Sequence, residues 1–208
     1  MYKEPVVAAA SEEGRLVTNG MSQYSRHERN ANSAIVVGIE PNDFTQGKFA
    51  AQNDSVLAGI EFQRQLEEQA FRMGGATYDA PVQLVGDFLA GRKSGEHGSV
   101  TPSYKPGVKY CDLSDALPDY AVAAIREALP AFERKIKGFS MNEATLTAVE
   151  TRTSSPIQIT RDRETLQSLN AKGLYPAGEG AGYAGGILSA GIDGIKIAEA
   201  MALSMLKA

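Results

Sequence analysis

The chain has 208 residues, of which 43% are hydrophobic and 22% are charged, and it carries a net charge of −4. These values are typical of a globular protein with one large or two small domains, and the acidic balance argues against a nucleic-acid partner. No apolar run approaches the roughly 20 residues that cross a bilayer, and acidic residues near the N-terminus exclude a signal peptide. The single cysteine, Cys111, cannot form an internal disulfide. We therefore expect a cytoplasmic protein with no membrane partner.

The first 45 residues have the pattern of strands and turns. "PVVAAA" (5–10) is a short apolar run, and Asn19-Gly20 is a signal for a tight turn. "SAIVVGI" (33–39) is continuous and β-branched, which predicts a strand that is covered on both faces.

The middle of the chain has a helical pattern. Residues 57–75 carry one apolar stripe, with Gly74 and Gly75 as the expected end of a helix. Residues 92–109 are rich in Gly, Pro and Ser and predict a long loop. Residues 114–139 predict a second helix, which Pro130 should kink or split. The apolar positions of the two stripes are Phe62, Leu66, Ala70 and Met73, and Ala121, Ile125 and Leu129.

The last part returns to strands and ends in a helix. "ATLTAVETRT" (144–153) alternates, Pro156 favours extended backbone, and "GLYPAG" (173–178) predicts a short strand. In the final helix, Gly191 and Gly194 each cost about 1 kcal/mol relative to alanine, so we expect another group to approach the helix closely. One face carries Ile187 or Leu188, Gly191, Ile192, Ile195, Ala198 and Ala202, and the other carries Ser189, Asp193, Lys196 and Glu199.

Between the last predicted strand and this helix lies a glycine-rich turn, "GEGAGYAGG" (178–186). Free N–H groups and the dipole at a helix start attract anions or polarised oxygens. Glu179 would repel a phosphate, but a carboxylate accepts hydrogen bonds from sugar or polyol hydroxyls. The pattern therefore predicts a hydroxylated ligand, with tight packing of the turn as the open alternative.

Two nucleotide-binding motifs are missing from the chain, namely G-x-G-x-x-G after an early strand and the P-loop motif. "GLYPAGEGAGYAGGILSAGIDGIKIAEAM" (173–201) nevertheless resembles the C-terminal flavin-binding segment of FAD-dependent dehydrogenases related to glutathione-reductase-type flavoproteins. "RNANSAIVVGI" (29–39), "YCDLSDALPDY" (110–120) and "ETRTSSPIQI" (150–159) extend the likeness to a bacterial family of FAD-dependent, or NAD(FAD)-utilising, dehydrogenases.

The resemblance implies a mixed α+β or α/β fold with FAD as cofactor. Residues 1–45 and 140–208 would form the C-terminal part of a Rossmann-like FAD-binding domain, and 46–139 an inserted substrate or cap domain. Gly178-Glu179 would hold a polyol hydroxyl, and the helix start would face the pyrimidine edge of the flavin. The residues assigned to the cofactor are Gly178, Glu179, Gly180, Gly182, Gly185, Gly186, Ile187, Arg152, Ser154 and Ser155.

A complete member of this family carries the dinucleotide motif upstream of these segments. We therefore expect the C-terminal portion of an FAD-dependent oxidoreductase that acts on a small-molecule substrate, with a separate N-terminal dinucleotide-binding half as a partner. The alternatives are a non-catalytic fragment that needs this half to bind FAD, and a structural module whose glycines serve helix packing.

Other polar residues have common structural explanations beside the functional ones. Surface solvation fits His27 and His97, which lack metal-ligand spacing, and capping fits Asp87. Turn chemistry fits Asn30 and Asn32. Arg26, Arg29 and Arg152 could hold an anionic substrate, with arginine on a surface strand as the common alternative. The sequence identifies no metal site and no catalytic acid or base.

Overall fold

The computed structural model describes residues 7–21, 27, 29–53 and 55–206. The chain forms two compact units. The large unit comprises Met1–Asp54 and Glu61–Thr151, and the small unit comprises Ser55–Ile60 and Arg152–Ala208. This division follows contacts within the chain, so the assignment of 1–45 and 140–208 to an FAD-binding domain, with 46–139 inserted, stays a prediction.

A three-stranded sheet lies at the centre of the large unit. β3 (Ala80–Leu84) is its middle strand, with β4 (Val108–Tyr110) parallel on one side and β5 (Thr145–Thr147) antiparallel on the other. Val82 pairs with Tyr110 in one ladder and with Thr147 in the other. β3 is buried almost throughout, because it has a neighbour on each edge and apolar side chains on each face.

Helices α2 (Val85–Ala90) and α3 (Asp119–Lys135) complete this part of the fold, together with α1 (Ala58–Met73) from Glu61 onward. The predicted stripes are confirmed, since Phe62, Leu66 and Ala70 of α1 and the three named positions of α3 are buried. α1 ends before Gly74, where a side chain would collide with the carbonyl oxygen of Asp79. The expected split at Pro130 is wrong, because α3 continues through this residue. The buried apolar face that precedes Pro130 offsets a cost of about 3 kcal/mol.

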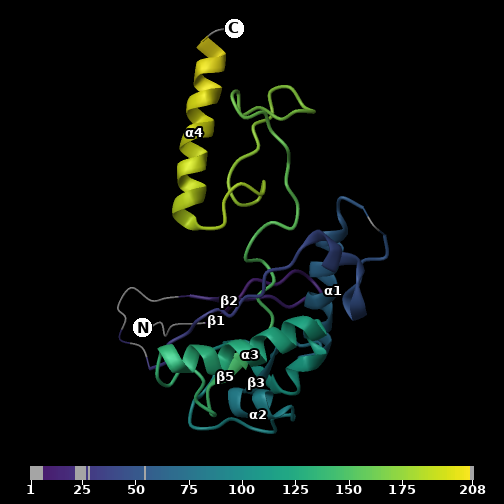
Figure 1. Ribbon diagram of the computed structural model, residues 1–208, viewed down its shortest axis with the longest axis vertical. Coiled ribbons are helices and arrows are strands. Elements are labelled where there is room, and N and C mark those ends of the chain that lie inside the picture. Colours follow the sequence, from purple (N-terminus) through teal and green to yellow (C-terminus); the bar gives the residue numbers. More distant parts are fainter. Residues whose placement is uncertain (1–6, 22–26, 28, 54, 207–208) are drawn as a thin grey trace. The chain divides into compact units, whose positions relative to one another are not determined.

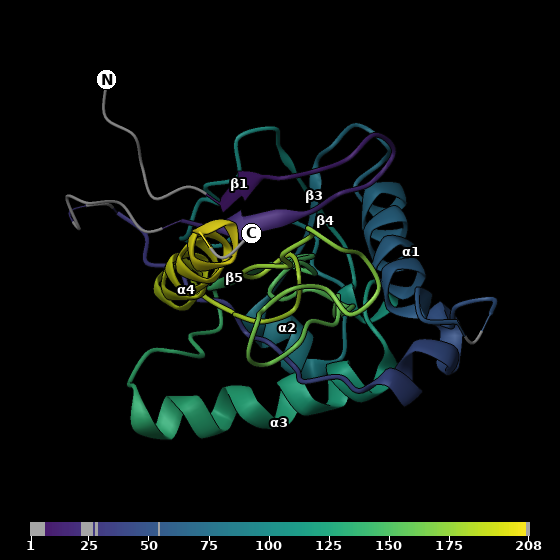
Figure 2. The ribbon, with the colours of Figure 1, turned by 90° about the horizontal axis from the view of Figure 1, so that it is seen from above.

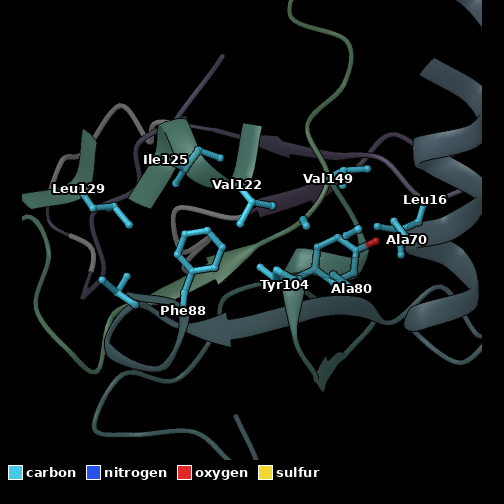
Figure 3. Close-up of a cluster of buried hydrophobic side chains, with 13 residues drawn as sticks. Leu16, Ala70, Ala80, Phe88, Tyr104, Val122, Ile125, Leu129 and Val149 are labelled. Carbon is cyan, nitrogen blue, oxygen red and sulfur yellow. The ribbon is translucent and has the colours of Figure 1, made fainter. Parts of the chain in front are cut away.

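One hydrophobic core joins these elements. Figure 3 shows Phe88 of α2 directed toward Val122 and Ile125 of α3, while Tyr104 from the long loop lies near Val149. In Figures 1 and 2, α1 and α3 both lie beside the sheet that supplies Ala80. The predicted loop between α2 and β4 is confirmed, and its Tyr104 belongs to the core.

The N-terminal strands form a two-stranded ribbon. β1 (Val7–Ala9) and β2 (Thr18–Gly20) are antiparallel, with Val7 opposite Gly20. The prediction of a tight turn at Asn19-Gly20 is wrong, since both residues lie in β2 and the chain reverses before Leu16. Thr18 joins this ribbon to the segment after β5, because its N–H donates to the carbonyl oxygen of Val149 at 2.8 Å.

The apolar run Ala34–Ile39 forms no strand in the structure. Residues 35–37 nevertheless alternate, with Ile35 and Val37 packed against the core and Val36 exposed, whereas Ile39 is exposed although it has the parity of the packed positions. The prediction of a strand covered on both faces is therefore wrong, because no described strand lies alongside it to supply ladder hydrogen bonds.

The small unit consists mainly of irregular chain from residue 152 to 186, followed by α4 (Ile187–Leu206). In Figures 1 and 2 this green coil runs beside the yellow helix α4. The predicted strand at 173–178 is wrong, because Leu174 instead closes a turn with Ala171 and accepts a hydrogen bond from Ser168. β5 is likewise shorter than the alternating pattern of 144–153.

The whole is a mixed α+β structure, as predicted, whereas a Rossmann-like part and an inserted domain remain predictions. None of the helices described here is both long enough and apolar enough to cross a membrane.

Candidate cofactor-binding site

The glycine-rich segment forms a closed turn at the start of the path into α4. The N–H of Gly182 donates to the carbonyl oxygen of Glu179 at 2.9 Å, and the N–H of Tyr183 donates to that of Gly178 at 3.0 Å. Gly178 has φ +67° and Gly182 has φ +80°, both in the left-handed region that favours glycine. The closed turn leaves Glu179 exposed to solvent.

The "RTSSP" segment leads into residues that run along this turn. The hydroxyl of Ser155 lies 2.8 Å from the carbonyl oxygen of Ile157 and 3.3 Å from that of Gly180. The N–H of Ile159 donates to the carbonyl oxygen of Ala181 at 3.1 Å. Thus the structure brings Ser155 to the turn. Arg152 and Ser154, which precede Ser155 in the chain, are exposed.

The glycines of the turn and of α4 differ in what their environment requires. A Cβ added to Gly182 would lie 2.7 Å from the carbonyl oxygen of Ile157, so close packing explains this glycine. A Cβ on Gly180 or Gly185 would have no described atom within 4 Å, and one on Gly186 would make an ordinary contact with Ser189. The packing alternative therefore accounts for Gly182, and open space lies above Gly180 and Gly185.

An ion pair that the sequence analysis missed holds the turn against α4. Arg161 forms two hydrogen bonds with Asp193, Nη2 to Oδ1 at 2.6 Å and Nη1 to Oδ2 at 2.9 Å. The Arg161 and Asp193 side chains are only 10% and 12% exposed. Asp193 Oδ2 also accepts the N–H of Gly178 at 2.8 Å. One carboxylate thereby links α4 to the first residue of the turn.

Two further groups complete the surroundings of Arg161. Its Nη1 donates to the carbonyl oxygen of Pro176 at 2.7 Å, and its guanidinium lies 3.6 Å from the centre of the Tyr183 ring. The backbone N–H of Arg161 donates to the Tyr183 hydroxyl at 3.0 Å. These contacts surround a nearly buried charge with partners, which such a charge requires.

The hydrogen bonds from Arg161, with that from Gly178, hold the pKa of Asp193 at about 2, below its ordinary value. The same pairing raises the pKa of Arg161. Asp193 was expected on the solvated face of the final helix, and this placement is wrong. In the sequence, the only sign of a special role for Asp193 is that this carboxylate lies between Gly191 and Gly194, and nothing distinguishes Arg161 from other arginines.

The expected apolar face of α4 is exposed. Ile187 is 93% exposed, Leu188 83%, Ile192 56% and Ile195 71%, whereas Ile197 is buried. A Cβ on Gly191 or Gly194 would meet no described atom within 4 Å. The close approach that these two glycines predict is thus absent from the described residues.

The other candidates have structural partners or lie at the surface. Asp87 accepts hydrogen bonds from Arg92 at 2.6 Å and Ser94 at 2.7 Å, and the bond from Ser94 is the main cause of its lowered pKa. The side-chain amide of Asn30 donates to Thr101, and that of Asn32 to Met21. Arg29 donates to the carbonyl oxygen of Ser99, His27 and His97 are exposed, and Arg26 lies outside the described residues.

Neither the cysteine nor an acidic cluster offers a second reactive centre. Burial raises the pKa of the Cys111 thiol to about 11, so the nucleophilic thiolate is disfavoured at neutral pH. In the described part of the chain, no group of three His, Cys, Asp or Glu side chains is placed to hold a metal ion. A pocket of about 300 Å³ in the large unit contains none of the predicted site residues; it is lined by Lys48, Phe49, Gln65, Glu68, Gln69, Arg72 and Asp115.

Comparison with known proteins places the chain in a family. Residues 5–153 match the family described as "FAD-dependent protein, C-terminal domain-like". An uncharacterized protein of Clostridium beijerinckii is 54% identical over 194 residues, which cover 93% of this chain and 35% of that protein. The chain therefore spans about a third of this relative's length. It belongs to the FAD-dependent protein, C-terminal domain-like family.

Proposed function

We propose that the chain is the C-terminal portion of an FAD-dependent oxidoreductase and that the glycine-rich turn binds the ribityl and isoalloxazine parts of FAD. Family membership supports the choice of FAD, and the turn supplies the observation that carries the proposal. Gly180 and Gly185 have open space where a side chain would be, although the fold itself does not require glycine there. A flat ring and its polyol chain need such close access to backbone.

Each group of the turn has a distinct role in this proposal. The exposed carboxylate of Glu179 accepts hydrogen bonds from a ribityl or ribose hydroxyl. At the start of α4, Gly185, Gly186 and Ile187 present N–H groups that have no acceptor within the helix. These donors and the helix dipole face the O2/N1 edge, where reduced flavin is negative. The flavin supplies the hydride chemistry when it is bound.

The "RTSSP" segment forms the neighbouring wall of the proposed site. Ser155 contacts Gly180 through its hydroxyl, and Ser154 and Arg152 precede Ser155 by one and three residues of chain. Arg152 and Ser154 are exposed and carry donors suited to the anionic or carbonyl groups of a flavin or its small-molecule substrate.

We also propose that a separate N-terminal dinucleotide-binding half is the partner of this chain. The chain lacks the dinucleotide motif, and the relative is about three times as long as the matched region. α4 exposes Leu188, Ile192 and Ile195 beside Gly191 and Gly194, at which an added Cβ would meet no described atom within 4 Å. An apolar helix with small residues suits close packing against another element, which here would come from that half.

The visible absorption spectrum of the purified chain with FAD tests the proposed function. We expect the shifted flavin bands of bound cofactor, either with the chain alone or after addition of the region of the C. beijerinckii protein outside the match. Absence of binding in both mixtures would show that the turn is not a flavin site. Binding only in the second mixture would identify the chain as a fragment that needs its other half.

The role of Glu179 is tested by the variant Glu179→Ala. A hydrogen bond to a charged group is worth about 1.5–3 kcal/mol, so we expect a ten- to hundredfold weaker affinity for FAD. Glu164→Ala is the matched control, because Glu164 is an exposed carboxylate of the same unit outside the turn. Isothermal titration calorimetry measures both, and equal affinities of the two variants would remove Glu179 from the site.

A further inference from the structure

The Arg161–Asp193 pair joins three segments of the small unit. Arg161 lies on the coil that follows "RTSSP", Gly178 opens the glycine-rich turn, and Asp193 lies in the second turn of α4. Asp193 Oδ2 accepts from Arg161 at 2.9 Å and from Gly178 at 2.8 Å, so one oxygen atom serves both segments.

The position of Gly178 gives this shared oxygen its importance. Gly178 immediately precedes Glu179 and has φ +67°. Fixing a glycine in one backbone conformation costs conformational entropy, so contacts must hold it there. The Gly178 carbonyl oxygen closes the turn by accepting a hydrogen bond from the N–H of Tyr183, and the Arg161 guanidinium stacks on the Tyr183 ring. Both ends of the turn are therefore attached to the same ion pair.

We propose that Arg161 and Asp193 are positioning residues that hold the turn in its binding conformation before any ligand arrives. This inference rests on the proposed function, since the ligand of the turn is taken to be FAD. The two side chains are nearly buried and paired with each other, so they act through the orientation of Gly178 and Glu179.

A positioning role has a kinetic signature that a contact role lacks. If only a fraction of molecules has the competent turn, the apparent affinity falls by that fraction while the bound complex is unchanged. Loss of the ion pair should then slow FAD association and leave the dissociation rate constant as it was. Loss of a direct contact such as Glu179 should chiefly raise the dissociation rate constant.

The experiment compares Asp193→Asn and Arg161→Lys with the control Asp162→Asn. The two aspartates differ in partners: Asp162 accepts from Thr165 at 2.7 Å and from Glu164 at 3.0 Å, and caps its own local turn. Amide hydrogen exchange measures the protection of the backbone N–H groups from Gly178 to Tyr183 in the chain without FAD. Stopped-flow flavin fluorescence measures the association and dissociation rate constants of FAD. It uses the chain alone, or the chain with the region of the C. beijerinckii protein outside the match if only that mixture binds FAD.

We expect Asp193→Asn to raise exchange at Gly178 and to lower the FAD association rate constant about tenfold, with dissociation unchanged within twofold. Arg161→Lys, which keeps the charge but loses the two-pronged bond, should show the same pattern to a smaller extent, and Asp162→Asn should show neither change. Unchanged exchange at Gly178 in Asp193→Asn, or faster dissociation with unchanged association, would overturn the positioning role.

Failure of the two proposals can be told apart. If the wild-type protein binds no FAD, the proposed function is wrong and positioning for this cofactor falls with it. Hydrogen exchange then still decides whether the ion pair holds the turn. If the wild type binds FAD but the variants bind with wild-type kinetics, only the positioning role is wrong.

Discussion

At the scale of single residues, Asp193 shows how one carboxylate can organise a loop. Its two oxygens accept three hydrogen bonds, two from Arg161 and one from Gly178. The pattern of the final helix places Asp193 with Lys196 and Glu199 on a polar face, and the structure turns it toward the coil instead. Periodicity cannot foresee this, because a buried charge becomes favourable only when its partner arrives.

The pKa of Asp193 predicts how the turn responds to acid. Its folded pKa is about 2, so the carboxylate adds stability above its unfolded value of about 3.9, and this stability is lost as the pH falls toward 2. Arg161 and Lys196 are the cations that face it. We expect protection of the Gly178 amide, measured by hydrogen exchange against the intrinsic rate, to decline between pH 4 and pH 2. Protection that is constant over this range would contradict the assignment.

At the scale of elements, the helices of the large unit are held by their buried faces. In α3, which continues through Pro130, Ile125 and Leu129 pack into the core beside Phe88 (Figure 3). In the run Ala34–Ile39, Ile35 and Val37 pack against the core, but the backbone is not paired with any described strand. The β-branched pattern predicted a strand there, and this was wrong because the pairing of strands depends on neighbours that a local pattern does not contain.

Leu129→Ala tests the contribution of the α3 face to stability. Leu129 is fully buried, so the cavity and the lost transfer free energy should lower the free energy of unfolding by about 2–5 kcal/mol. Glu127→Ala on the exposed face of the same helix is the control and should change it by about 0.5 kcal/mol or less. Urea denaturation followed by circular dichroism measures both, and a similar small change in each variant would refute the packing.

At the scale of the whole molecule, the two compact units differ in how the family match covers them. The family match ends at residue 153, near the division between the units after Thr151. The small unit, which holds the glycine-rich turn, lies almost entirely beyond that match and is covered by the likeness to the C. beijerinckii protein over 93% of the chain. The proposed FAD site therefore lies in the small unit, whereas the family match lies chiefly in the large unit.

Ile195→Glu tests whether the exposed face of α4 is a docking surface for the N-terminal half. Ile195 is 71% exposed, so the change should leave the free energy of unfolding within about 0.5 kcal/mol of the wild type. Burial of an unpaired carboxylate in the interface should weaken association with the region outside the match at least tenfold. Analytical ultracentrifugation measures this, with Asn170→Glu on the exposed coil as control. Equal association of both variants would place the interface elsewhere.

The sequence by itself determined the elements that depend on neighbouring residues along the chain. The apolar stripes of α1 and α3, the start of α4 after the glycines, and the mixed α+β class follow from periodicity and helix ends. The tertiary structure decided which groups meet. It paired Arg161 with Asp193 across 32 residues, moved the reversal of the N-terminal ribbon away from Asn19-Gly20, and left the apolar face of α4 exposed. These outcomes depend on the path of the whole chain, because burial and ion pairing are energies between segments that only folding brings together.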